Sequence, residues 1–254
     1  MATWSDLNGE LDRWRATRFF PTLWWRDDDA QTATQDLEPL LELSTKFSVP
    51  VHLAVIPDLL RDSLCARLEG CDTVSCLQHG FAHVNHEPAE AGASEFGDHR
   101  DIALQRRDLR AGWLSLVRAQ LPNLLPGVVP PWNRMSDPTL LELPGLGYRF
   151  ISAFEGPTAS LPIAGLSRFN AHVDPMRWRH GGRFRGTEAT LEFLTGHLAA
   201  RRTGQADLRE PTGLLTHHLL AGSDLWDFVS ELLERLEHQG VARWVNLASL
   251  LKTG

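Results

Sequence analysis

Short apolar runs and longer amphipathic runs alternate along the whole 254-residue chain, and this alternation limits the possible folds most strongly. The short runs are bounded by turn residues and have the length of buried strands, whereas the longer ones repeat leucine at helical spacing. We expect eight strands, at residues 22–25, 51–56, 73–77, 127–129, 149–154, 167–173, 213–217 and 243–247.

Strands that alternate with helices and lack hairpin turns pair in parallel through right-handed crossovers. Seven or eight such units in a chain of this length favour a barrel over an open sheet. An open doubly wound sheet is the alternative, but the first strand leads into three aspartates instead of the glycine-rich turn of a dinucleotide site. We therefore predict an α/β fold, an irregular (β/α) barrel of seven or eight parallel strands, with residues 1–254 as a single domain.

Composition narrows the possible partners. The formal net charge of −7 and the scattered Lys and Arg residues give no basic surface for nucleic acid. The N-terminus is charged and helical in pattern, unlike a signal peptide, and no apolar run approaches the length of a membrane span. Three cysteines without metal-ligand spacing fit reduced thiols. We expect a cytoplasmic protein that acts on a small molecule or a carbohydrate; its oligomeric state stays open.

The unusual polar residues fall at the carboxyl ends of the expected strands. RDDDA follows the first strand, QHGFAH the third, PPWNR the fourth, HVDP the sixth and THH the seventh. In a barrel the carboxyl ends of the strands converge on one face, where catalytic groups gather. Five motifs that are far apart in the sequence are therefore expected to meet in one pocket.

The histidine motif predicts a metal site. His79 and His83 are four residues apart, so one tight turn after the strand can direct both imidazoles to one point. Two neutral imidazoles and one carboxylate form a three-ligand site with an open position, a common arrangement for catalytic zinc. The carboxylate can come from Asp27, Asp28 or Asp29. An HxxxH pattern alone is weak evidence, and the aspartates at the end of another strand strengthen it.

Taken together and in this order, the five motifs resemble those of the polysaccharide deacetylase superfamily, which includes carbohydrate esterase family 4. The resemblance extends from about Trp24 to the last strand. It implies an irregular, often seven-stranded barrel that uses a divalent metal, usually zinc, to remove acetyl groups from N-acetylated sugars.

The resemblance assigns roles to the first two motifs. Asp28 corresponds to the general base and Asp29 to a metal ligand, although a shift of one residue would select Asp27 and Asp28 instead. His79 and His83 correspond to the other two metal ligands. Gly80 departs from the family pattern, which usually has Ser or Thr there, and this departure puts a polymeric substrate in doubt.

The third motif of the family contributes an oxyanion hole. PPWNR resembles it, and the backbone N–H of Trp132 takes that role by resemblance. Val129 occupies the position where the family usually has an arginine. Arg134 follows Trp132 by two residues and is our candidate to supply the missing positive charge.

HVDPMRW and LLTHH resemble the fourth and fifth motifs. Asp174 matches an aspartate that orients other catalytic groups, and Arg177 replaces the motif's second aspartate. His217 matches the histidine that protonates the leaving amine, with His218 as the alternative. Because side chains alternate along a strand, only one of these two histidines should enter the pocket. The polar segment at residues 95–101 is expected to cover that pocket.

These assignments predict a metal-dependent hydrolase that removes an acetyl or other acyl group from an N-acetylated sugar or sugar derivative. The departures at Gly80, Val129 and Arg177 keep a second hypothesis open, a catalytically weak or inactive relative that binds metal and carbohydrate. A third hypothesis is an amidohydrolase that acts on a small non-sugar C–N substrate.

Overall fold

The computed structural model describes residues 1–154, 163–179 and 181–251, which fall into two compact units. The first unit takes the described residues of 1–27, 34–51 and 171–254, and the second those of 28–33 and 52–170. Strands β1 (Thr22–Ala30) and β2 (Val51–Val55) each begin in the first unit and end in the second. A single domain over the whole chain remains a prediction.

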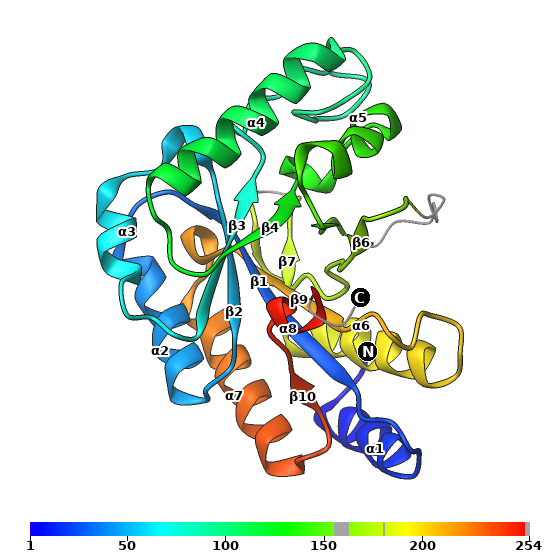
Figure 1. The fold of residues 1–254 in the computed structure, drawn as a ribbon. Helices are drawn as coiled ribbons and strands as arrows, with labels where there is room; N and C mark the ends of the chain where they lie inside the picture. Colours follow the sequence, from blue (N-terminus) through cyan, green and yellow to red (C-terminus); the bar gives the residue numbers. More distant parts are fainter. Residues whose placement is uncertain (155–162, 180, 252–254) are drawn as a thin grey trace. The chain divides into compact units, whose positions relative to one another are not determined.

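In the first unit, β1 lies between β10 (Arg243–Trp244) and β9 (Thr212–Thr216), and both pairs are parallel (Figure 1). The register with β9 runs from Leu23 beside Thr212 to Asp27 beside Thr216. The other elements of this unit are α1 (Trp4–Arg15), η1 (Gln35–Leu37), α2 (Glu38–Lys46), β7 (Met176–Arg177), β8 (Arg183–Phe184), α6 (Thr187–Arg202), η5 (His218–Leu220), α7 (Ser223–Gln239) and α8 (Leu247–Leu251).

Helix α1 illustrates how the amphipathic pattern produces packing in this unit. Thr3 and Asp6 form a reciprocal capping box at its start, which satisfies amides that lack helical partners. Its buried face includes Trp14, whose indole N–H donates to the Leu198 carbonyl of α6 at 3.2 Å. Buried Glu10 accepts two hydrogen bonds from Arg202, so apolar contact and a charged pair fix α1 against α6.

In the second unit, the strand order is β1, β2, β3 (Val74–His79), β4 (Leu124–Val129), β5 (Phe150–Ile151) and β6 (Ser167–Arg168). The pairs from β3 to β6 are parallel (Figure 1). The helices of this unit are η2 (Pro57–Leu59), α3 (Asp62–Leu68), α4 (Ile102–Arg118), η3 (Pro131–Asn133), α5 (Asp137–Glu142) and η4 (Pro144–Leu146).

A buried polar contact joins α4 to this sheet beside the apolar core. Gln78 of β3 donates to the Leu109 carbonyl of α4 at 3.1 Å and accepts from the Tyr148 hydroxyl at 2.6 Å. A Cβ at Gly112 would lie 2.4 Å from the Gln78 amide nitrogen, so the close approach requires glycine there. The core around this contact consists of Phe96, Leu109, Val128, Leu140, Leu143, Tyr148 and Ile151.

The predicted alternation of strands and helices is confirmed, and all eight expected strands are present with different bounds. Strand β1 runs on through the aspartates to Ala30, so Asp27, Asp28 and Asp29 lie inside the strand instead of after it. The sequence analysis missed the antiparallel pair of β7, in the fourth motif, and β8, which follows it. Among the described helices, none has both the length and the apolar composition that crossing a membrane requires.

Candidate active site

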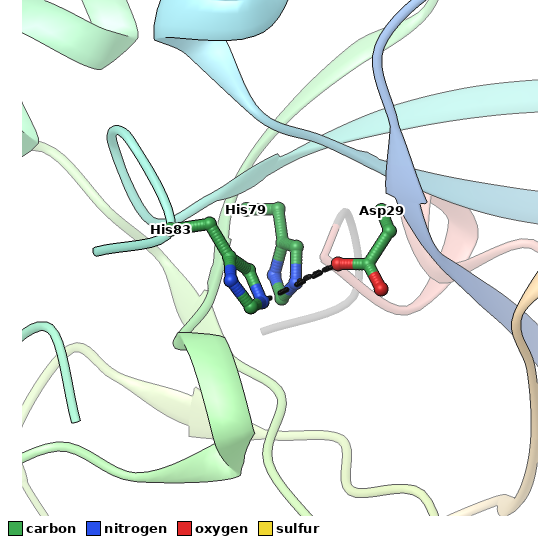
Figure 2. A group of neighbouring side chains, drawn as sticks. All are labelled: Asp29, His79 and His83. Carbon is green, nitrogen blue, oxygen red and sulfur yellow. Dashed lines mark hydrogen bonds and ion pairs between the residues drawn. The ribbon is translucent and has the colours of Figure 1, made fainter. Parts of the chain in front are cut away.

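Three side chains converge in the second unit, where the sequence predicted a metal site. Asp29 lies near the end of β1, His79 is the last residue of β3, and His83 follows in the next loop. One ligand atom from each lies within 4.8 Å of the other two. Figure 2 shows both imidazoles directed at Asp29, whose Oδ1 lies 3.1 Å from His79 Nε2 and 3.4 Å from His83 Nε2.

The backbone around this cluster is held in unusual conformations. Asp29, His83 and Trp132 have φ angles of 70°, 57° and 54°, in the left-handed region that side chains other than glycine rarely adopt. Each such residue costs free energy and persists only where its surroundings hold it, which is typical of functional sites. For Asp29, the positive φ interrupts the regular alternation of side chains along β1.

A backbone carbonyl orients the first imidazole. His79 is buried, and its Nδ1 donates to the Val129 carbonyl at 3.0 Å. This hydrogen bond fixes the ring and presents Nε2 to Asp29, the arrangement common for metal-binding histidines. Val129, where the resembled family usually has an arginine, therefore contributes to the site through its backbone.

The electrostatic environment differs between the two histidines. Burial opposes protonation of His79, but the hydrogen bond to Asp29 and the charges of Asp28 and Asp29 outweigh it, so the pKa of His79 is raised. Burial and the neighbouring His79 lower the pKa of His83. His83 is therefore neutral at pH 7, the form that binds metals. Two imidazole nitrogens and a carboxylate oxygen in this spacing fit a divalent cation.

Asp28, the predicted general base, is buried with 2% of its surface exposed. Its negative charge contributes to the raised pKa of His79, which places Asp28 within the electrostatic field of the three candidate ligands. Its neighbour Asp27 belongs to the first unit, where its carboxylate binds His218 and Thr216. The geometry thus brings Asp29 to the two histidines, and the roles of base and ligand for the aspartates stay predictions.

The third motif forms the tight turn η3, and Trp132 lies at its centre. The Trp132 ring packs on the His83 ring with centroids 4.4 Å apart, while 38% of the residue remains exposed. The hydrogen bonds of the turn are donated by the next two amides, from Asn133 to Pro130 and from Arg134 to Pro131. The Trp132 amide takes part in neither of these bonds.

Arg134 is exposed, and its guanidinium donates to the Ala93 carbonyl at 3.4 Å. The Ser94 hydroxyl in turn donates to the Arg134 carbonyl at 3.1 Å. These contacts connect Arg134 to the loop around residues 92–94. Among the described contacts, none brings its charge to the three candidate ligands, and its catalytic role remains a prediction.

In the first unit, the fourth motif positions an indole beside a histidine. Asp174 accepts from the Met176 amide at 2.8 Å and from the Trp178 indole at 2.6 Å. The Trp178 ring meets the His217 ring edge to face, with centroids 4.7 Å apart. Asp174 therefore orients Trp178, which packs against His217. Arg177 is exposed, and the described partners of Asp174 do not include it.

The two consecutive histidines of the fifth motif have different surroundings. His218 is buried, and its Nδ1 lies 2.5 Å from Asp27 Oδ1. His217 is 7% exposed and contacts the Trp178 ring instead. Both histidines are buried, and the expectation that only one of them enters a pocket stays a prediction.

Sequence reasoning missed Glu95, a buried carboxylate in the second unit. Its Oε2 accepts from the Phe81 amide at 3.0 Å and its Oε1 from the Ala82 amide at 2.8 Å, so it binds the loop that carries His83. The adjacent Phe96 is fully buried in the core. Segment 95–101, expected to cover the pocket, is therefore anchored at its start.

Comparison with models of known protein families finds no match, and comparison with curated protein sequences finds none either. Solved structures, in contrast, are similar over nearly the whole chain. A protein from Mycobacterium smegmatis, provisionally described as a polysaccharide deacetylase, superposes with a TM-score of 0.68 at 14% identity, covering 94% of this chain and 91% of its own.

Two esterases extend this likeness. A family 4 acetyl xylan esterase from Clostridium thermocellum, in complex with a cobalt ion, gives a TM-score of 0.58 at 12% identity over 91% of both chains. A family 4 carbohydrate esterase from Streptomyces lividans, in complex with acetate, gives 0.56 at 12% identity, covering 88% of this chain and 91% of its own. These likenesses confirm the predicted fold class: the chain has the polysaccharide deacetylase-like (β/α) barrel fold.

Proposed function

We propose that this chain is a metal-dependent hydrolase that removes an acetyl or other acyl group from an N-acetylated sugar or sugar derivative. One observation carries the proposal: Asp29, His79 and His83 gather their ligand atoms within 4.8 Å at the positions that the sequence resemblance assigns to metal ligands. The solved structures add support, because the similar proteins include one described with bound cobalt and one with acetate.

The donor set suits zinc and also other first-row divalent ions, and we propose zinc as the resident metal. Asp29, His79 and His83 would hold the ion, and the Val129 carbonyl would keep the His79 ring in its ligating orientation. The chemistry that a bound ion supplies is polarisation of the amide carbonyl and a lowering of the pKa of water toward about 7.

Asp28 and Trp132 supply the remaining groups from the second unit. Asp28 accepts the proton of the attacking water, a general-base role that typically contributes about 10² to 10⁴ in rate. The Trp132 amide, unused by the hydrogen bonds within its own turn, stabilises the negative oxygen of the tetrahedral intermediate. Packing of the indole on His83 holds this amide in place.

His217 is the proposed proton donor to the leaving nitrogen. The assignment rests on the sequence motif and on the local packing in the first unit, where Trp178 lies against the imidazole. Asp174 acts through Trp178 as a positioning residue. His218 is less suited to this role because its Nδ1 is engaged by buried Asp27.

The test begins with elemental analysis of the purified wild-type protein beside His83→Ala and a matched control, His86→Ala. His86 is an exposed histidine three residues further along the same loop. We expect about one metal ion per chain in the wild type and in His86→Ala, and none in His83→Ala. No metal in the wild type after loading with zinc or cobalt would reject the proposal.

Activity is then measured as acetate release from a chitin oligosaccharide, a nucleotide-linked N-acetylglucosamine and acetylated xylan. Release that depends on the metal and disappears in His83→Ala supports the hydrolase. Binding of metal and of these ligands without acetate release would instead support the catalytically weak relative.

A further inference from the structure

Glu95 lies twelve positions beyond His83 and reaches back to the loop that carries it. The carboxylate is 1% exposed, and its two oxygens accept from successive amides, those of Phe81 and Ala82, at 3.0 and 2.8 Å. Hydrogen bonds from amides to a buried carboxylate are about twice as strong as neutral ones. Glu95 therefore fixes the backbone immediately before His83.

Gly80 provides the space for this carboxylate. Its φ is +56°, and a Cβ built there would lie 2.1 Å from Glu95 Oε2 and 2.6 Å from Pro131 Cγ. The proline ring is rigid, so a side chain at position 80 would displace the carboxylate. Gly80 and Glu95 therefore form a matched pair, at the position where the resembled family usually has Ser or Thr.

Glu95 is itself held firmly. Phe96 is fully buried in the core, its carbonyl accepts from the Ser136 amide at 2.8 Å, and Arg100 donates to the Glu95 carbonyl at 3.3 Å. On the other side of the contact, the Phe81 carbonyl accepts from the Asp58 amide at 2.9 Å. The carboxylate thus connects a rigid segment to the short loop that ends in the strained His83.

We propose that Glu95 is a positioning residue for the metal centre: with Gly80, it sets the 80–83 loop so that His83 meets His79 and Asp29. This inference rests on the proposed metal site and explains one departure from the family pattern. Instead of marking a lost site, Gly80 accommodates a different support for the same ligand.

The experiment measures zinc affinity by competition with a chromophoric chelator for the wild type, Glu95→Ala and Glu95→Gln. The matched control is Glu90→Ala, an exposed carboxylate in the same loop. Because partners of metal ligands typically contribute 10- to 100-fold to affinity, we expect Glu95→Ala to bind zinc about 10- to 100-fold more weakly. Glu95→Gln keeps one acceptor oxygen and should lose less, whereas Glu90→Ala should bind like the wild type.

Gly80→Ala tests the matched pair from the other side. The added Cβ should displace Glu95 and reduce zinc affinity to a similar degree. Because both substitutions disrupt one contact, the loss in Gly80→Ala/Glu95→Ala should be smaller than the sum of the single losses. Fully additive losses would show that Gly80 and Glu95 act separately and would reject the pairing.

A second measurement separates this inference from the proposed function. In metal-free protein, NMR-detected hydrogen exchange of the Phe81 and Ala82 amides should be at least about tenfold faster in Glu95→Ala than in the wild type or Glu90→Ala. If the wild type binds no metal, the proposed function fails, and exchange alone decides whether Glu95 holds the loop. Wild-type zinc affinity and wild-type exchange in Glu95→Ala would overturn the inference.

Discussion

Strand β1 carries two aspartates that meet histidines in contrasting ways. Asp27 is fully buried, and its carboxylate accepts from the Thr216 hydroxyl at 2.6 Å and from the His218 amide at 3.0 Å, with the His218 imidazole 2.5 Å away. Asp29 is 27% exposed, and one of its oxygens faces both His79 and His83. Both contacts pair an aspartate with histidine, and the two aspartates lie only two positions apart in the strand.

The difference separates a structural pair from a candidate metal centre. The oxygens of Asp27 are engaged by protein donors on both sides, and the pair is closed to solvent, which suits a contact that holds β1 against the fifth motif. Asp29 shares a single oxygen between two imidazoles whose ligand nitrogens point to the same place. Burial and the number of donors, more than residue type, distinguish the two centres.

The largest expected effect comes from Asp29→Ala. Removal of the only carboxylate in the three-ligand cluster should reduce bound metal from about one ion per chain to none and abolish metal-dependent acetate release. The fold should persist, because Asp29 is partly exposed. Elemental analysis and circular dichroism measure the two effects. A folded Asp29→Ala protein that retains its metal would show that the two aspartates do not differ as described.

Asp28→Asn should lower the rate of acetate release by about 10² to 10⁴, because the amide cannot accept the proton of the attacking water. Bound metal should remain near the wild-type level, which distinguishes this variant from Asp29→Ala. The measurement is kcat beside metal content, with KM expected to change little. Equal metal loss in both variants would argue that Asp28 is a ligand and not a base.

Asp27→Ala should primarily affect stability. Removing one partner of a buried hydrogen-bonded group leaves the other partners unsatisfied, which typically costs about 1 to 3 kcal/mol. Urea unfolding should therefore show a large decrease in the free energy of unfolding. The control is His217→Ala in the same motif, which leaves the Asp27 contact intact and should destabilise much less. Loss of metal without loss of stability in Asp27→Ala would contradict the assignment.

The sequence pointed to the region of the three candidate ligands, because their motifs lie in short segments at strand ends, and the structure brings Asp29, His79 and His83 together. His79 and His83 share one turn, whereas strand order left Asp27, Asp28 and Asp29 open and only the family resemblance assigned Asp29. The same reasoning predicted the strands and the alternation with helices. Their bounds were less accurate, since β1 continues through three aspartates whose partners were not yet known.

The remaining parts depend on contacts that leave little trace in the sequence. His218 and Asp27 are 191 positions apart, and their pairing requires the strand register to be known. Glu95 binds backbone amides, which every residue except proline has, so no side-chain pattern reveals its target. The β7 and β8 pair comprises two residues in each strand, too few for a periodic signal.

A third histidine centre, in the first unit, sharpens the comparison because its two rings stack on each other, and the carboxylate beside His172 is farther away than those of Asp27 and Asp29 are from their histidines. His172 and His197 stack with ring centroids 3.7 Å apart, and His172 Nδ1 accepts from the Gly213 amide at 3.0 Å. Glu210 lies 3.7 Å from His172 Nε2. Burial and the charge of Arg201 lower the pKa of His197 to about 4. Burial also lowers the pKa of His172, to about 2, with smaller contributions from the neighbouring His197 and Arg201.

These lowered pKa values predict an acid-sensitive stability. Below about pH 6.5 the unfolded chain protonates both histidines while the folded protein does not, so the free energy of unfolding decreases as the pH falls. The decrease should reach at most about 1.4 kcal/mol per pH unit for each histidine, and for His197 it ends at a higher pH than for His172. Each histidine lowers the free energy of unfolding over the pH range between about 6.5 and its own pKa in the folded protein.

Urea unfolding of the wild type and of His172→Gln at pH 7, 6 and 5 tests this smallest effect. Other groups titrate in the same range, so the informative quantity is the difference in slope between the two proteins. His172→Gln should lose stability more gradually on acidification, whereas the exposed control His238→Gln should follow the wild type. Equal slopes in all three would mean that His172 accepts a proton in the folded state. The distinction between His172 and the histidines paired with Asp27 and Asp29 would then disappear.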